Sequence, residues 1–111
     1  MIASYPDRRF QLWEYRVSHG SLLVRSPKSA DSAHNVDVVF VGVDYLAVPR
    51  VLEGVTIERG LEDDRELLNG TVGEVDPDRL FVLISAGRRH YVVAVACRVS
   101  ESDTDIFDSP F

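Results

Sequence analysis

The stretch at residues 80–99, LFVLISAGRRHYVVAVACRV, decides the fold class of this chain. Its two flanks, 80–85 and 91–99, are apolar and rich in β-branched side chains, and Gly87 lies between them. Because glycine readily adopts the positive φ angles of tight turns, this pattern predicts two antiparallel strands joined by a reversal. We therefore expect a β-hairpin here, and the rest of the chain is interpreted around it.

A second hairpin is predicted near the N-terminus. Residues 10–17, FQLWEYRV, place aromatic and β-branched side chains at alternating positions, and 21–26, SLLVRS, follow after a short turn that contains Gly20. Residues 36–43, VDVVFVGV, are apolar at nearly every position, which is typical of a strand with protein on both faces. These segments add three strands to the two of the C-terminal hairpin.

The remaining segments are shorter and carry weaker patterns. The polar stretch 27–35 predicts an exposed connection, and Pro49 should interrupt strand pairing until about residue 54. Residues 61–69, LEDDRELLN, have early acids, late leucines and a following glycine, Gly70, which together predict a helix. We expect a short strand at 71–75 and a turn at Asp76-Pro77-Asp78.

These elements predict a mainly β fold. About six or seven short strands with at most one or two short helices indicate a mostly antiparallel small sandwich or open barrel, since the connections are too short for helical crossovers. The alternative is an α+β arrangement in which the helix at 61–69 covers one face of the sheet. We expect one domain at residues 1–100, followed by an acidic C-terminal tail at 101–111 that includes Ile106, Phe107 and Phe111.

The charge of the chain is concentrated in its second half. The 111 residues carry a formal net charge of −6, and residues 1–55 are neutral, so residues 56–111 hold all of it. Such a surface repels nucleic acid unless a basic stripe compensates, and the only adjacent basic pairs are Arg8-Arg9 and Arg88-Arg89. We therefore expect no nucleic-acid partner and favour a basic protein partner.

Hydropathy and cysteine content indicate the compartment. No apolar run approaches the roughly 18–20 residues of a membrane-spanning helix, and the first residues lack the apolar core of a secretory signal. The single cysteine, Cys97, allows no internal disulfide and no four-cysteine zinc site. The sequence thus predicts a cytoplasmic protein without membrane contact.

The sequence contains no recognisable pattern for catalysis or cofactor binding. His19, His34 and His90 are far apart and form no HxH or HxxxH arrangement, so no metal site is predicted. Cys97 lies in the apolar run VVAVACRV, which favours a buried small hydrophobe over a nucleophile. Nucleophile elbows and glycine-rich phosphate loops are missing as well. We expect no catalytic residue, no metal and no cofactor.

Two groups of residues have the composition of recognition surfaces. Planar donors and aromatic rings, which are enriched in protein interfaces, occur on the predicted hairpins at Tyr15, Arg16, His19, Arg88, Arg89 and His90. The acids Glu62, Asp63 and Asp64 begin the predicted helix and are interpreted as a solvent face that attracts a basic partner.

Three functional hypotheses follow. The first is a non-enzymatic protein-binding module of the adaptor or neutralising type, whose acidic half meets a basic partner. The second is a small-molecule-binding barrel or small enzyme, with a site where His19 and His90 meet Tyr15 and Arg16. The third is a structural homo-oligomer without a ligand, formed through a sheet edge or through the basic turn of one copy and the acids of another.

Overall fold

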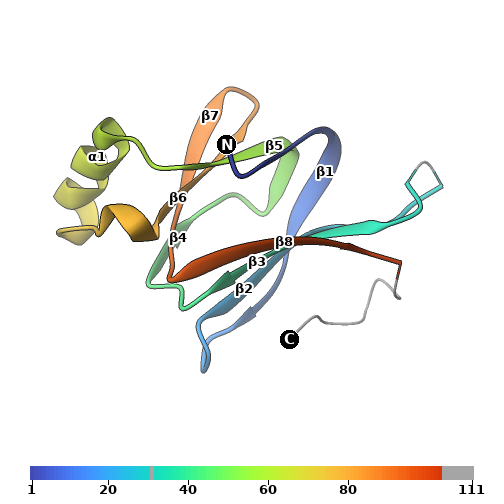
Figure 1. The fold of residues 1–111 in the computed structure, drawn as a ribbon, viewed down its shortest axis with the longest axis horizontal. Helices are drawn as coiled ribbons and strands as arrows, with labels where there is room; N and C mark the ends of the chain where they lie inside the picture. Colours follow the sequence, from blue (N-terminus) through green and yellow to red (C-terminus); the bar gives the residue numbers. More distant parts are fainter. Residues whose placement is uncertain (31, 104–111) are drawn as a thin grey trace.

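The computed structural model describes residues 1–30 and 32–103 and shows one curled antiparallel β-sheet with a small helical appendage (Figure 1). The strands are β1 (Ala3–Arg16), β2 (Ser21–Ser26), β3 (Asn35–Val41), β4 (Tyr45–Ala47), β5 (Val51–Arg59), β6 (Leu80–Ser85), β7 (Arg88–Val93) and β8 (Ala96–Ser102). Between β5 and β6 lie the helix α1 (Glu62–Val72) and the 3-10 helix η1 (Pro77–Arg79).

The strand order in the sheet is β4-β7-β6-β5-β1-β2-β3-β8, and every pairing is antiparallel. β1 is long enough to join two parts of the sheet, since its first half pairs with β5 and its second half pairs with β2. The register of β1 against β5 shifts between Tyr5 and Arg9, where the strand bends. Gly54 lies opposite this bend, and a Cβ there would stand 2.6 Å from the Pro6 carbonyl oxygen.

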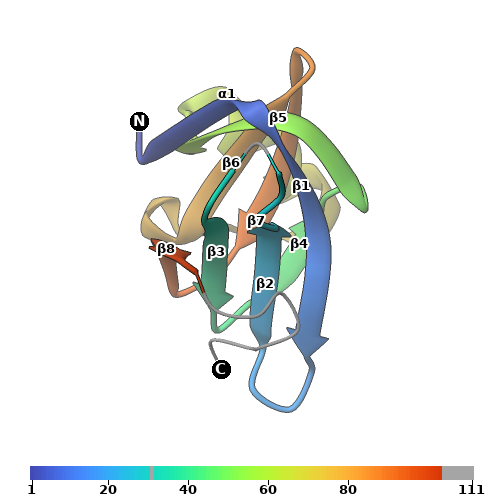
Figure 2. The ribbon, with the colours of Figure 1, turned by 90° about the vertical axis from the view of Figure 1, so that its right-hand side faces the viewer.

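The two ends of the sheet meet at a corner. β4 continues β3 and β8 continues β7, each after a break of two or three residues. At the corner the Val95 amide donates to the Val41 carbonyl (2.9 Å) and the Asp44 amide donates to the Val93 carbonyl (2.8 Å). Gly42 allows this close crossing, because it has φ +66° and a Cβ would stand 2.6 Å from Val95 Cγ2. The sheet therefore curls into an open barrel and does not split into a sandwich (Figure 2).

Apolar side chains fill the barrel. The inner faces of the strands contribute the buried residues Phe10, Leu22, Val24, Val36, Val38, Phe40, Leu52, Val55, Ile57, Phe81, Leu83, Val92 and Ala94. Phe40 and Phe81 meet edge to face across this core with ring centroids 5.7 Å apart. Burial of so many large side chains is the main stabilising contribution to the fold.

A charged pair is buried on the other face of β2 and β3, since its residues alternate along the strands with those of the barrel core. Arg25 of β2 and Asp37 of β3 are direct cross-strand partners. Arg25 donates from Nε to Asp37 Oδ1 (2.6 Å) and from Nη2 to Oδ2 (3.0 Å), and the Trp13 ring lies 5.5 Å from the guanidinium carbon. Their side chains are only 1% and 4% exposed, so the two charges compensate each other away from water.

The helix α1 packs on the outer face of the sheet, at the end formed by β4, β6 and β7 (Figure 1). A second small core lies beneath it, made of Leu68 and Val75 from the appendage and Leu80 and Val93 from the sheet. Leu80 and Val93 alternate with Phe81 and Val92, which point into the barrel, so the two cores share the strands β6 and β7.

The predicted mainly β, antiparallel fold with a short helix is confirmed. Residues 1–30 and 32–103 form eight strands where about six or seven were expected, because the corner divides the run at 91–99 into β7 and β8 and produces the short β4. The strand predicted at 71–75 is wrong. There α1 continues to Val72 and ends at Gly73, which has φ +87°, and no strand forms. The Asn69 side chain accepts from the Val75 amide (3.0 Å) and turns the chain back into the small core.

Several segment boundaries also differ from the sequence prediction, most of all at β1, which begins at Ala3 and not at Phe10. Strand pairing resumes at Val51, directly after Pro49-Arg50, and not at residue 54, since Val51 pairs with Gln11. β8 extends to Ser102 through its pairing with Asn35, beyond the expected domain limit at residue 100. The predicted acidic tail from residue 104 onward, with Ile106, Phe107 and Phe111, lies outside the described residues. Over the described ranges, no helix has the length and apolar character needed to cross a membrane.

Candidate functional site

Asp64 fixes α1 to the sheet. The Arg89 guanidinium of β7 donates to both Asp64 carboxylate oxygens, from Nε to Oδ1 (2.9 Å) and from Nη2 to Oδ2 (2.7 Å). The Tyr91 hydroxyl donates to Oδ1 (3.0 Å), and the Leu61 amide at the start of the helix donates to Oδ2 (2.8 Å). One buried carboxylate therefore caps the helix and anchors it to β7.

These contacts change the acidity of the groups involved. The hydrogen bonds from Arg89 hold the pKa of the Asp64 carboxyl below its ordinary 3.8, although burial opposes the change. Asp64 in turn raises the pKa of Arg89, and burial together with the Asp64 contact raises the pKa of Tyr91. The carboxylate stays ionised and both of its side-chain donors stay protonated at neutral pH.

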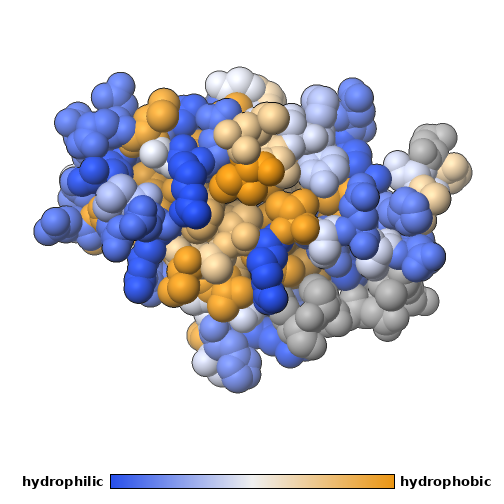
Figure 3. All heavy atoms as spheres, viewed as in Figure 1, coloured by the Kyte–Doolittle hydropathy of each residue, from blue (hydrophilic) through white to orange (hydrophobic). Residues whose placement is uncertain are grey.

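The residues that surround this anchor are strongly acidic. We call residues 61–79 the acidic lobe, since they contain seven carboxylates and two arginines and therefore carry a net charge of −5. Six of the carboxylates belong to exposed residues: Glu62, Asp63, Glu66, Glu74, Asp76 and Asp78. The lobe forms one end of the molecule (Figure 1). In the space-filling view the surface of the lobe is mainly hydrophilic, whereas apolar side chains gather over the strands of the sheet (Figure 3).

Most of the acids of the lobe are not neutralised by bases. Among the described residues, Glu62 pairs with Arg65 (2.9 Å), and Asp76 accepts from the Asp78 amide (2.9 Å). Asp63, Glu66 and Glu74 make no ion pair within the ranges that the structure covers. The lobe thus presents uncompensated negative charge to the solvent.

A groove of about 420 Å³ lies where the lobe meets the sheet. Its apolar lining comes from Val75 and Val93 of the small core, the Tyr45 ring and the half-exposed Val72. Its charged lining is formed by Asp44, Glu74, Asp76 and Arg79. Arg79 Nη1 lies 3.4 Å from Asp44 Oδ2, and both side chains are well exposed (46% and 65%). The groove combines an apolar surface with three carboxylates and one guanidinium.

The structure separates the three predicted acids of the helix. Glu62 and Asp63 are exposed, as a solvent face requires, whereas Asp64 is 4% exposed and bound to Arg89 of the same chain. Of the adjacent basic pair at the β6–β7 turn, Arg88 is exposed and Arg89 is occupied by this contact. The sequence suggested that the basic turn of one copy attracts the acids of another copy. In the structure, Arg89 of this turn instead binds Asp64 of its own chain.

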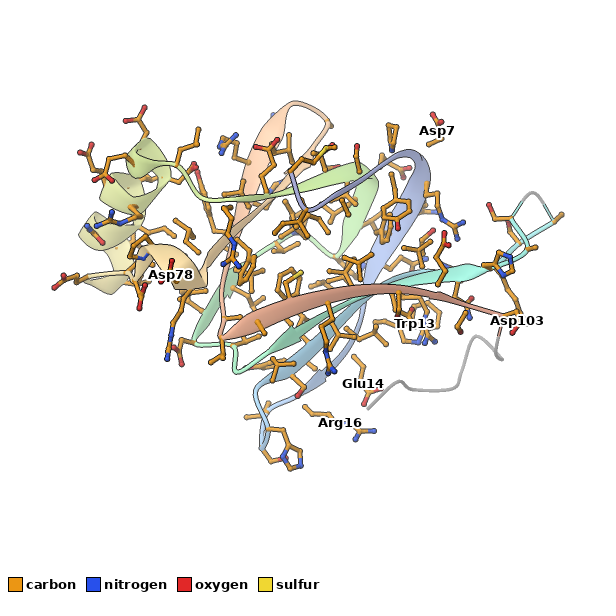
Figure 4. The ribbon with its side chains drawn as sticks, in the orientation of Figure 1. Asp7, Trp13, Glu14, Arg16, Asp78 and Asp103 are labelled. Carbon is orange, nitrogen blue, oxygen red and sulfur yellow. The ribbon has the colours of Figure 1, made fainter. Side chains whose placement is uncertain are left out.

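The residues of the first hairpin lie elsewhere. Tyr15 is 43% exposed, Arg16 Nε donates to Glu14 Oε2 (2.6 Å), and His19 is exposed in the β1–β2 turn. Figure 4 shows Glu14 and Arg16 well away from Asp78 of the acidic lobe. The β1–β2 turn and the β6–β7 turn lie at opposite sides of the barrel in both ribbon views, so His19 and His90 are not neighbours (Figures 1 and 2).

Burial changes the acidity of two other groups that the sequence singled out, His90 and Cys97. His90 is half-buried, and burial followed by the Arg88 charge lowers its pKa, so it is neutral at pH 7. Burial raises the pKa of the Cys97 thiol to about 11, which keeps it protonated and a poor nucleophile. Within residues 1–30 and 32–103, no group of three histidine, cysteine or acidic side chains is placed to hold a metal ion.

The sequence did not reveal the groove. Asp44 and Tyr45 follow the apolar run of β3, and Arg79 precedes β6, so each lies at a strand end, where exposed functional side chains are common. Their proximity depends on the pairing of β4 with β7, which joins Tyr45 to Val93. No short-range pattern encodes that pairing.

Comparison with known proteins gives no relative: no family model, no curated protein and no solved structure matches this chain.

Proposed function

We propose that this chain is a non-enzymatic protein-binding module whose acidic lobe meets a basic segment of another protein. The observation that carries the proposal is the position of the uncompensated acids: they gather at one end of the molecule, on an appendage that the barrel carries on its outer face. Because apolar side chains fill the interior of the open barrel, we look for the binding surface on the outside of the molecule.

Charge supports this function in two ways. An exposed field of one sign accelerates encounter with a partner of opposite charge, and it discriminates against acidic proteins and nucleic acid. Asp63 and Glu66 lie exposed on α1 and make no ion pair within the described residues, so both carboxylates are accessible to a partner. The anchor at Asp64 holds these acids in a fixed position relative to the sheet.

The two other hypotheses have less support. The barrel interior is filled with apolar side chains, and the two histidines of the small-molecule hypothesis lie on opposite hairpins. Self-association through the basic turn retains only Arg88, because Arg89 is bound to Asp64. The cytoplasmic address and the oligomeric state stay predictions from the sequence.

A charge-reversal experiment tests the proposal. Reversal at Asp64 would detach the helix, so the informative variant is Asp63→Lys/Glu66→Lys, which changes exposed positions only. A displayed library of random peptides is selected on the wild-type protein, and the association rate of the enriched peptides is measured by stopped flow. We expect enrichment of arginine and lysine, and an association rate that falls with added salt and falls about tenfold in the variant.

The matched control is Asp7→Lys/Asp103→Lys, which makes the same change in net charge on the side of the molecule away from the lobe (Figure 4). Its association rate should stay close to that of the wild type. Enrichment of peptides without basic residues, or equal slowing in both variants, would contradict a role for the acidic lobe.

A further inference from the structure

The groove between the lobe and the sheet has the chemistry of a side-chain subsite. Its apolar side is formed by Val72, Val75 and Val93 with the Tyr45 ring, and its acidic side by Asp44, Glu74 and Asp76. A long side chain with an aliphatic stem and a cationic end matches both sides at once. We propose that the groove binds the side chain of a single arginine of the basic partner, an inference that rests on the proposed function and specifies its contact point.

The chain itself shows that a guanidinium fits at this rim. Arg79 lines the groove and directs Nη1 toward Asp44 Oδ2 at 3.4 Å. Arginine is favoured over lysine because a planar guanidinium bonds two carboxylate oxygens together and stacks on aromatic rings, and the groove lining contains three acids and Tyr45. The Glu74 carboxylate makes no ion pair within the described chain and is available to an incoming cation.

Arg79 then has a second role, as an internal competitor. Its contact with Asp44 is long and exposed, with 46% and 65% of the two side chains open to solvent, so it contributes little to stability. An arriving arginine competes with Arg79 for the same carboxylate. Removing the Arg79 charge should therefore strengthen binding, whereas removing the Glu74 charge should weaken it.

The probe for this subsite is Nα-acetyl-arginine amide, which is too small to bridge the groove and the rest of the lobe. Nα-acetyl-citrulline amide is its neutral isostere and serves as the ligand control at matched ionic strength. Methyl resonances of Val72, Val75 and Val93 are followed by NMR during titration. We expect saturable shifts with the arginine probe and much smaller ones with citrulline; the lysine analogue should bind more weakly than arginine.

Three charge variants make the test specific. We expect Glu74→Gln to weaken binding of the arginine probe about two- to fivefold and Arg79→Gln to strengthen it by a similar factor. Asp63→Asn, which makes the same charge change as Glu74→Gln but lies on the helix outside the groove lining, should leave the affinity unchanged. Opposite effects at two neighbouring exposed positions cannot arise from general damage to the fold.

Two failures are distinguishable. If basic peptides associate with the lobe in a salt-dependent way but the arginine probe leaves the groove methyls unshifted, the subsite is overturned and the protein-binding function stands. If Arg79→Gln weakens binding, or Asp63→Asn acts as strongly as Glu74→Gln, the groove is not the contact point. Absence of any salt-dependent peptide binding would overturn both.

Discussion

One bidentate arginine–carboxylate pair lies within the barrel and another joins the barrel to the acidic lobe, and the two pairs have different surroundings. Arg25–Asp37 joins neighbouring strands and is almost completely buried, with 1% and 4% exposure. Arg89–Asp64 joins the lobe to the sheet, and although Asp64 is buried, the Arg89 side chain is 34% exposed. The same kind of contact thus joins two barrel strands in one place and holds the lobe on the sheet in the other. We call the Arg89–Asp64 contact the clasp.

The apolar core of the barrel is also larger than the one beneath α1. Thirteen buried residues form the described core of the barrel, whereas four form the core beneath α1, so the lobe has far less apolar burial to hold it in place. We infer that the barrel folds around its own core and that the lobe depends on its polar clasp. Regions of low local stability are those in which binding surfaces commonly lie.

The largest effect is expected in the barrel core. Phe40→Ala removes one ring of the Phe40–Phe81 contact and leaves a cavity, which should lower the free energy of unfolding by about 3–5 kcal/mol. Chemical denaturation followed by tryptophan fluorescence measures the change. Leu67→Ala, at an exposed position of α1, is the control and should cost less than about 1 kcal/mol. If both variants lose a similar free energy of unfolding, the barrel core does not contribute more to stability than the surface of α1.

The second effect concerns the buried pair of the barrel. Arg25→Met leaves the Asp37 charge buried without its principal partner and should cost about 3 kcal/mol. The double variant Arg25→Met/Asp37→Leu removes both charges and should recover much of that loss in the same denaturation assay. If the double variant is less stable than Arg25→Met, the pair contributes net stability beyond mutual compensation.

A smaller and more local effect is expected at the clasp. Asp64→Asn keeps an acceptor for the Leu61 amide but loses the charge that Arg89 contacts, which should cost about 2 kcal/mol. Hydrogen exchange should accelerate at the amides of α1 and stay slow in β2 and β3. Asp63→Asn is the adjacent control and should change neither. Uniform acceleration throughout the barrel would show that the lobe and the barrel unfold as one unit.

The smallest effect is the response of the clasp to acid. Because the folded pKa of Asp64 lies below its ordinary 3.8, the clasp gives its full stabilisation above that value and loses it as the pH falls through the lowered pKa. NMR spectra should show the α1 resonances changing below about pH 4 before those of the barrel. In Asp64→Asn this early transition should be absent. Simultaneous changes of both regions in the wild type would argue against a separate clasp.

Local sequence patterns predicted most of the strands. Alternation near the N-terminus and the apolar runs at 36–43 and 80–99 identified both hairpins and the antiparallel class, because side-chain period and turn residues act over a few positions. The same patterns failed at the corner and at 71–75. There, long-range pairing of β3 with β8 and packing of Val75 against the sheet determine the backbone.

The candidate site was predictable only in its charge. Composition placed the net negative charge in the second half, and Glu62 and Asp63 are exposed as expected. The sequence could not separate Asp64 from its neighbours, since all three acids occur in one run and only the approach of β7 buries one of them. The groove likewise depends on residues 44–45, 72–79 and 93, which are distant in the chain.

The sequence by itself determined a mainly β chain with an acidic second half and one short helix, because propensity, alternation and charge are properties of neighbouring residues. The tertiary structure alone decided that the sheet curls into an open barrel, that Asp64 becomes a clasp and that a groove forms beside the lobe. Those features arise where strands far apart in the chain pair and exclude water, and the energies of such contacts depend on their partners.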